Sequence, residues 1–175
     1  VEDKHFYRIW TEKAELSAQV TGKFIHESRQ DHSILPKVGD WVAVKLVPNE
    51  EKATIHAILP RRTQITRKTT GRETSAQILA TNIEIVFLVT AADASFNPAR
   101  LERMLVMARD SGARPVVILN KIDLCADLDT KLAEATRTAG DVLVLAACAL
   151  TGRGVKKLAG LIKPGDTVAF IGTSG

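Results

Sequence analysis

The chain has little cysteine and no long apolar run, and both absences limit what it can be. Its two cysteines, Cys125 and Cys148, are too few and too far apart in the sequence for a disulfide framework or a zinc site. No segment reaches the roughly 18 consecutive apolar residues that a membrane helix needs, and no signal peptide opens the sequence. We therefore expect a cytoplasmic protein with no membrane contact and no metal site in these residues.

An initiating methionine is also absent, because the sequence starts at Val1. From this start we expect that an N-terminal piece has been lost. The composition is otherwise that of a globular protein, since 45% of the 175 residues are hydrophobic and can form a real core. This length suits one large domain or two small ones.

Acidic residues are missing from the basic stretch RRTQITRKTTGR, residues 61–72, although the net charge of the whole chain is only +4. The stretch could contact nucleic-acid phosphates, or it could be a solvated linker, and both interpretations stay open. The residues that would contact RNA are Arg61, Arg62, Arg67, Lys68 and Arg72.

The first part of the chain, residues 1–62, has the pattern of short strands. Strand-forming runs lie at residues 16–25, 40–47 and 52–59, with turn residues between them. Strands at this spacing without helices predict a small all-β barrel, of the OB-fold type or the SH3-like type. Aromatic residues of such a barrel either stack on bases or pack in its core, and for Trp41 we favour the core. The other candidates are Phe6, Tyr7, Trp10 and Phe24.

The second part, residues 63–175, begins with the basic connecting segment 63–82 and then alternates strands with helices. This alternation predicts an α/β domain with a parallel sheet, right-handed crossovers and ligands at the carboxyl ends of the strands. Leu101, Leu105 and Ala108 would face the sheet. The expected strands are residues 83–91, 113–120, 141–147 and 166–172, and the expected helices are 97–112, 128–140 and 152–162.

The sequence NKID follows directly after the apolar strand VVIL, so Asn120, Lys121 and Asp123 leave the sheet together. A carboxylate at this place can accept two parallel hydrogen bonds from the N1 imino and N2 amino groups of guanine, which adenine does not offer. Lys121 would lie along the base, and Asn120 would connect this loop to its neighbours. The motif predicts recognition of guanine.

The next strand ends in CALTGRG, where guanine-nucleotide proteins carry a short SAL-like turn. In such a turn the backbone N–H of Ala149 would point at guanine O6, between Cys148 and Leu150. Cys148 replaces the usual serine, which weakens a side-chain hydrogen bond but leaves the backbone donor in place.

The chain ends in FIGTSG, an apolar strand that runs into a glycine-rich turn. Gly172, Thr173, Ser174 and Gly175 match the first four positions of the phosphate loop G-x-x-x-x-G-K-[ST], whose backbone N–H groups hold phosphates. The lysine and the hydroxyl that binds Mg²⁺ would come after Gly175. Because phosphate loops usually precede the guanine motifs, this order predicts a circularly permuted domain.

With these motifs in this order, the whole chain resembles the RsgA (YjeQ) family of circularly permuted GTPases, which act in maturation of the small ribosomal subunit. The resemblance implies a barrel that contacts the ribosome and its RNA, a P-loop domain that binds GTP or GDP with Mg²⁺, and a C-terminal zinc domain. It also implies that hydrolysis is stimulated by the small subunit. We expect a monomer.

The chain departs from the family pattern at Cys148 and at Glu84, where the family more often has aspartate. The phosphate-loop lysine, the switch regions and the zinc ligands are not among these residues, so we expect no catalytic residue here and no hydrolysis by this chain alone. One alternative is a ribosome- or RNA-binding module with a degenerate nucleotide domain. Another, an ATP-using P-loop enzyme, is disfavoured by Asp123.

Overall fold

The structure is a computed structural model that describes residues 6–28, 32–68 and 76–172. The chain divides into two compact units. The first comprises residues 1–62 and 67–81, and the second comprises residues 63–66 and 82–175. This division separates the barrel pattern from the strand-helix pattern.

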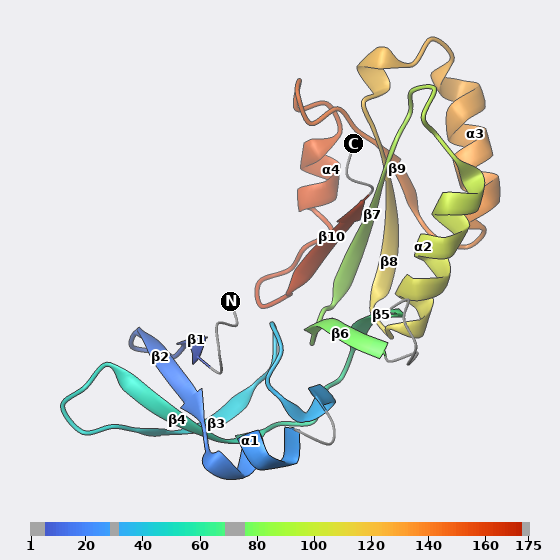
Figure 1. The fold of residues 1–175 in the computed structure, drawn as a ribbon. Coiled ribbons are helices and arrows are strands. Elements are labelled where there is room, and N and C mark those ends of the chain that lie inside the picture. The colour runs from blue at the N-terminus through green and yellow to red at the C-terminus, as the bar shows by residue number, and fades with distance from the viewer. Residues whose placement is uncertain (1–5, 29–31, 69–75, 173–175) are drawn as a thin grey trace. The chain divides into compact units, whose positions relative to one another are not determined.

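The first unit contains a four-stranded sheet with the order β1-β2-β4-β3 (Figure 1). Its strands are β1 (Phe6–Trp10), β2 (Glu15–Val20), β3 (Val42–Leu46) and β4 (Lys52–Ile58). The pair β2 and β4 is parallel, whereas β1 with β2 and β3 with β4 are antiparallel. In β1 and β2 side chains alternate between the core and solvent, as the period of two in a strand requires.

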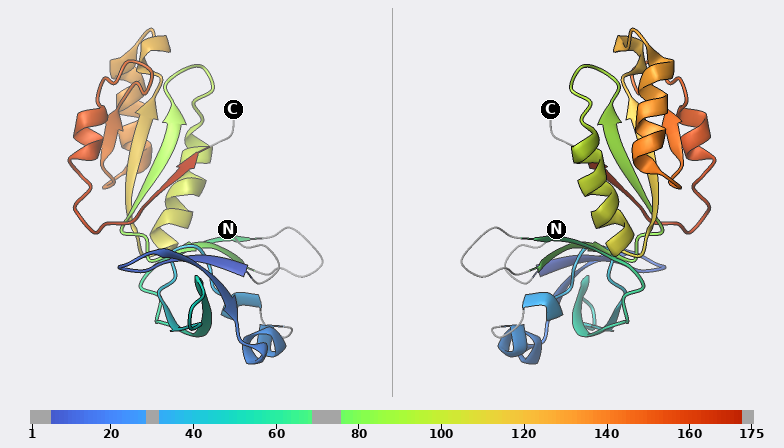
Figure 2. Two further views of the ribbon diagram at one scale, coloured as in Figure 1. Left: turned by 90° about the vertical axis from the view of Figure 1, so that its left-hand side faces the viewer. Right: turned by 90° about the vertical axis from the view of Figure 1, so that its right-hand side faces the viewer.

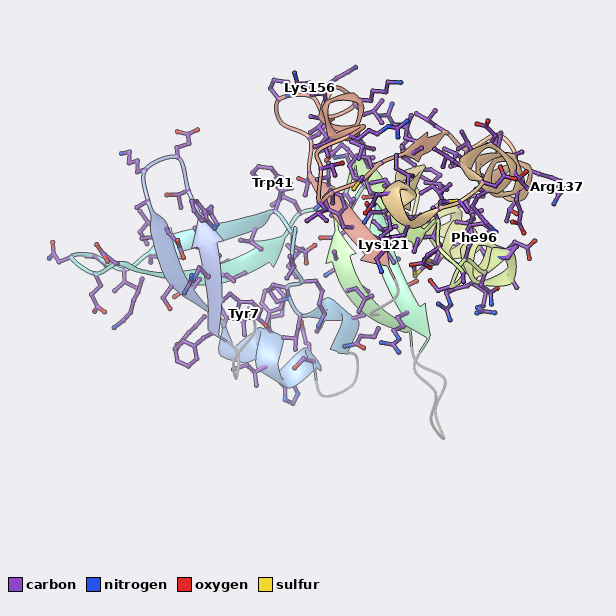
Figure 3. All side chains as sticks on the ribbon, turned by 90° about the horizontal axis from the view of Figure 1, so that it is seen from above. Tyr7, Trp41, Phe96, Lys121, Arg137 and Lys156 are labelled. Atoms are coloured by element: carbon purple, nitrogen blue, oxygen red, sulfur yellow. The ribbon has the colours of Figure 1, made fainter. Side chains whose placement is uncertain are left out.

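The core of this unit is small and aliphatic. One face of the sheet supplies Ala18, Val20, Ala53 and Ile55, and Leu35 closes the cluster. Helix α1 (Gly22–Ser28) packs Phe24 and Ile25 against it, and a 3₁₀ turn, η1 (His32–Ile34), follows. Tyr7 packs against the same cluster from β1 (Figure 3).

Two predictions for this unit were wrong. The run at residues 16–25 is only partly a strand, because α1 begins at Gly22 and the N–H of Ile25 donates to the carbonyl of Thr21. Phe24 and Ile25 both pack against the core cluster, which a helix allows because its apolar stripe is about 100° wide or more, whereas consecutive residues of a strand point to opposite faces. Trp41 is not in the core, because 65% of it is exposed.

A closed barrel remains a prediction. No strand pair among the described residues joins β1 to β3, the two outer strands of the sheet. Strands β5 (Gln64–Lys68) and β6 (Ala76–Thr81) form a separate two-stranded sheet.

The second unit contains the predicted parallel sheet, with the order β10-β7-β8-β9. Its strands are β7 (Ile85–Ala91), β8 (Arg114–Asn120), β9 (Val144–Ala146) and β10 (Val168–Gly172). All three strand pairs are parallel, so the four carboxyl ends lie at one edge of the sheet. Within this sheet β10, the last strand in sequence, thus pairs with β7, the first, which fits the predicted permutation.

Helices cover both faces of this sheet, α2 and α3 on one and α4 on the other (Figures 1 and 2). Their bounds are α2 (Pro98–Asp110), α3 (Leu128–Ala139) and α4 (Val155–Ala159), and a 3₁₀ turn, η2 (Ile122–Leu124), follows β8. Asn97 and Asp127 cap the first two helices with their side chains. Helix α4 is shorter than expected, because Gly154 and Gly160 bound it.

Alternate residues of the central strands supply the two faces. Phe87 and Ile118 pack with Leu158 and Leu161 on the α4 face. Leu119 packs with Ala135 on the α3 face. The predicted α2 residues Leu101, Leu105 and Ala108 are all buried. None of the helices in the described part of the chain is long and apolar enough to cross a membrane.

Candidate functional site

The loops that carry the sequence motifs all leave the same edge of the parallel sheet. The register places Ala91 opposite Asn120, and Leu119 opposite Ala146. It also places Gly172 opposite Val89. The NKID loop, the CAL turn and the start of the FIGTSG segment therefore lie at the same edge of the sheet, although Asn120 and Gly172 are 52 positions apart in the sequence.

Asn120 connects two of these loops, as predicted. Its side-chain Oδ1 accepts a hydrogen bond from the backbone N–H of Ala149 at 3.1 Å. This bond fixes the position of the CAL turn, and in this structure it engages the N–H that was expected to face guanine O6. Leu150, the third residue of the turn, is exposed.

Asp123 and Cys148 make the second connection. The thiol of Cys148 donates to Oδ1 of Asp123, with Sγ and Oδ1 2.9 Å apart. Cys148 is 2% exposed, whereas Asp123 is exposed and its Oδ2 accepts no hydrogen bond from any residue in the described ranges. A carboxylate oriented on one side and accessible on the other fits a ligand with adjacent N–H donors, which is the donor pattern of guanine.

The backbone around Cys148 is held by a tight turn. Its N–H donates to the carbonyl of Arg153 and its carbonyl accepts from Gly152, both at 2.9 Å. Gly154 adopts a φ of +81°, and a Cβ there would lie 2.4 Å from the carbonyl oxygen of Ala146. Only glycine allows this close approach between α4 and the end of β9.

Lys121 has a partner that sequence reasoning missed. Its Nζ lies 3.7 Å from Oδ2 of Asp93, which belongs to the loop after β7. Lys121 is labelled in Figure 3. Hydrogen bonds from the hydroxyl and the N–H of Ser95, together with the charge of Lys121, hold the pKa of Asp93 below its ordinary value. Lys121 itself has a left-handed backbone with a φ of 60°. The pairing of β7 with β8 brings the two residues together.

The phosphate-loop prediction falls mainly outside the described residues. Gly172 ends β10, and Thr173, Ser174 and Gly175 lie beyond the described ranges. No group of three or more His, Cys, Asp or Glu side chains suited to a metal ion occurs in the described part of the chain.

Glu84 has a structural role at the opposite edge of the sheet. Its Oε2 accepts from the N–H of Thr167 at 2.8 Å, and its own N–H donates to the carbonyl of Thr167. These bonds connect the start of β7 to the segment before β10.

The basic stretch is not uniform. Arg61 makes a bidentate ion pair with Asp40, with Nε 2.8 Å from Oδ1 and Nη2 2.7 Å from Oδ2. The guanidinium of Arg61 is therefore already paired with an acid of the first unit. Arg62 and Arg67 are exposed, the side chain of Lys68 is not described, and Arg72 lies outside the described residues.

Asp40 accepts these hydrogen bonds, and its side chain is 1% exposed. It also accepts from the N–H of Lys37 at 2.8 Å and from the hydroxyl of Thr81 at 2.7 Å. Burial alone raises the pKa of Asp40, but the hydrogen bonds from Arg61, Lys37 and Thr81 together hold it below its ordinary value.

Curated proteins similar to this chain share one name. The chain is 43% identical over 183 residues to the small ribosomal subunit biogenesis GTPase RsgA of Opitutus terrae, an alignment that covers all of this chain and 50% of that protein. It is 40% identical to RsgA 2 of Lactiplantibacillus plantarum, over 99% of this chain and 49% of that protein. The chain thus spans about half the length of these relatives.

Solved structures agree on the fold. YjeQ from Thermotoga maritima matches 98% of this chain and 58% of its own, with a TM-score of 0.73 and 23% identity. YloQ, described as a circularly permuted GTPase, matches with a TM-score of 0.69 and 23% identity, over 98% of this chain and 57% of its own. A family model described as RsgA GTPase matches residues 58–175. The chain therefore belongs to the RsgA GTPase family.

Proposed function

We propose that this chain supplies the guanine-reading half of a GTPase that acts in late assembly of the small ribosomal subunit in the cytoplasm. The observation that carries the proposal is the joined pair of loops, in which Asn120 holds Ala149 and Cys148 holds Asp123. The names of the relatives support the biological context. GTP or GDP with Mg²⁺ would be the ligand.

In this proposal each residue of the site binds or orients the base. Asp123 accepts the two N–H groups of guanine, and the stem of Lys121 lies along the ring. The Ala149 N–H turns from Asn120 Oδ1 to guanine O6 when the base binds. The phosphate loop begins at Gly172 to Gly175. Mg²⁺, when bound, would neutralise charge on the phosphates. Hydrolysis in such proteins depends on positioning and charge stabilisation, and we propose no catalytic residue among these 175.

We further propose that the first unit is an OB-type barrel that contacts ribosomal RNA. Trp10 supports this proposal because 80% of it is exposed, and Phe6 is exposed on the same face of β1. Exposed aromatic side chains on a sheet are suited to stacking on unpaired bases. Arg62, Arg67, Lys68 and Arg72 would add phosphate contacts. A monomeric state and the division into domains at residues 62 and 63 stay predictions.

A hydrolysis assay tests the function. A full-length protein that includes this chain should hydrolyse GTP slowly alone and faster when purified small ribosomal subunits are added, whereas ATP should not be a substrate. Binding to subunits with no effect of any nucleotide would instead support the RNA-binding module with a degenerate nucleotide domain.

A further inference from the structure

The segment around α4 displays five cations. Arg153, Lys156, Lys157 and Lys163 are exposed within eleven residues of sequence, and the guanidinium of Arg114 reaches the same segment by donating to the carbonyl of Leu161 at 3.3 Å. We call these five side chains the α4 surface. The acid of this segment, Asp166, accepts from the N–H of Lys163.

The charges of the α4 surface are not neutralised within the described residues. None of the five cations makes a salt bridge there, whereas other cations of the same unit do: Arg109 pairs with Asp141 at 2.6 Å and Lys131 with Glu134 at 2.9 Å. A cluster of one sign without counter-charges produces a positive field that attracts polyanions.

The segment that carries the α4 surface is packed against the core of the second unit. Leu158 and Leu161 pack against the sheet with Phe87 and Ile118, which leaves Lys156 and Lys157 on the outer side of the helix. Figure 3 shows Lys156 extending away from α4. An anion bound to these side chains would therefore contact α4, whose position is fixed by its packing against the sheet.

The same segment is also hydrogen-bonded to the CAL turn. The carbonyl of Arg153 accepts from the N–H of Cys148, whose thiol donates to Asp123. Gly154 packs within contact of the Ala146 carbonyl, so α4 and the turn have little room to move independently. A displacement of α4 would therefore shift the groups that hold Asp123.

From these observations we propose that the α4 surface binds the phosphate backbone of RNA and that this contact changes nucleotide affinity through the bonds between Arg153, Cys148 and Asp123. The inference rests on the proposed function and assigns to the nucleotide domain an RNA contact separate from the barrel. RNA is the partner that fits, because clustered Lys and Arg side chains are suited to a regular line of phosphates.

The test uses Lys156→Gln/Lys157→Gln in the full-length protein, with Arg100→Gln/Arg103→Gln as the matched control. The control removes two exposed cations from α2, on the opposite face of the sheet. Affinity for purified small ribosomal subunits is measured between low and moderate salt. The α4 variant should lower the slope of log affinity against log salt by about one for each lysine, and the control should keep the wild-type slope.

The second readout is the affinity for GDP with and without subunits. All three proteins should bind GDP equally when alone, and subunits should change this affinity in the wild type and in the control but not in the α4 variant. Equal slopes for both variants, or α4-dependent binding to anionic lipid vesicles but not to subunits, would overturn the RNA contact. If the α4 variant binds subunits more weakly but subunits still change its GDP affinity as in the wild type, the proposed coupling between the α4 surface and the nucleotide site is wrong. A wild type that binds no GDP would instead refute the proposed function itself.

Discussion

Asp93 shows what a single residue adds to the candidate site. Its carboxylate is oriented by Ser95 and faces Lys121, whose stem we place along the base. Asn120, Asp123 and Cys148 could be predicted from the sequence because they follow buried strands directly. Asp93 could not, because its role depends on the pairing of β7 with β8, and an acid in a loop is common.

Replacing Asp93 should therefore weaken guanine-nucleotide binding without abolishing it. For Asp93→Asn we expect a roughly two- to five-fold loss of GDP affinity, since the ion pair is solvent-accessible and such pairs contribute little. Asp110→Asn, at the end of α2, is the control and should leave the affinity unchanged. Calorimetric titration measures both. Unchanged affinity in Asp93→Asn would show that Lys121 needs no positioning by this carboxylate.

Cys148 can be tested by two substitutions that differ only in a donor. Cys148→Ser keeps a hydroxyl that can donate to Asp123, so GDP affinity should equal or exceed that of the wild type. Cys148→Ala leaves Oδ1 of Asp123 without this donor and should weaken binding roughly five- to ten-fold. If the serine and alanine variants bind GDP equally, the thiol does not orient Asp123.

At the scale of elements, the structure shows which patterns determine secondary structure. The strands of the second unit were predicted because buried parallel strands are apolar on both faces. Helix α1 was missed because its seven residues include a single pair of core contacts, Phe24 and Ile25, which is too short a pattern to reveal a period of 3.6. The exposed position of Trp41 depends on how the residues before β3 pack, which composition does not determine.

The join between β9 and α4 gives a prediction about Gly154. A Gly154→Ala substitution should destabilise the second unit by about 1–3 kcal/mol, because it combines a left-handed backbone with a clash against the Ala146 carbonyl. Gly152→Ala is the matched control, since Gly152 has a φ of +77° but open space around its Cβ position. Urea unfolding followed by circular dichroism should show the larger loss for Gly154. Equal losses would mean that the close approach contributes nothing.

At the scale of the whole molecule, segments distant in sequence are joined by a few polar clusters. Asp40 joins Lys37, Arg61 and Thr81 within the first unit. Such a cluster could not be predicted, because nothing in the basic stretch indicates that Arg61 pairs with the buried carboxylate of Asp40. The order of the motifs, in contrast, did predict the permuted sheet, since parallel strands bring their carboxyl ends together in any chain order.

The Asp40 cluster makes the stability of the first unit depend on pH. The pKa of Asp40 is lowered in the folded state. The contribution of Asp40 to folding stability is therefore present above the ordinary carboxyl pKa of about 3.9 and is lost as the pH falls through the lower folded value. Stability should therefore decrease below about pH 4. Asp40→Asn should reduce this dependence and cost about 3 kcal/mol at neutral pH, because Arg61 would lose the negative charge and one of the two acceptor oxygens of its partner.

Tryptophan fluorescence during urea unfolding at several pH values measures this effect, since Trp10 and Trp41 both belong to the first unit. Glu50→Gln, which removes an exposed pair with Lys52, should keep the wild-type profile. An unchanged acid response in Asp40→Asn would show that other carboxyl groups control it.

The measurement that tests the central claim most directly is the nucleotide preference of Asp123→Asn in the full-length protein. An amide at this position can no longer accept both N–H groups of guanine, but its NH₂ can donate to the 2-oxo group of xanthine. The account predicts a loss of GDP affinity of at least about 100-fold and a gain for xanthosine diphosphate. Asp129→Asn, an exposed acid on α3, should keep the wild-type preference. Retained GDP affinity in Asp123→Asn would contradict the assignment of this edge of the sheet as a guanine site.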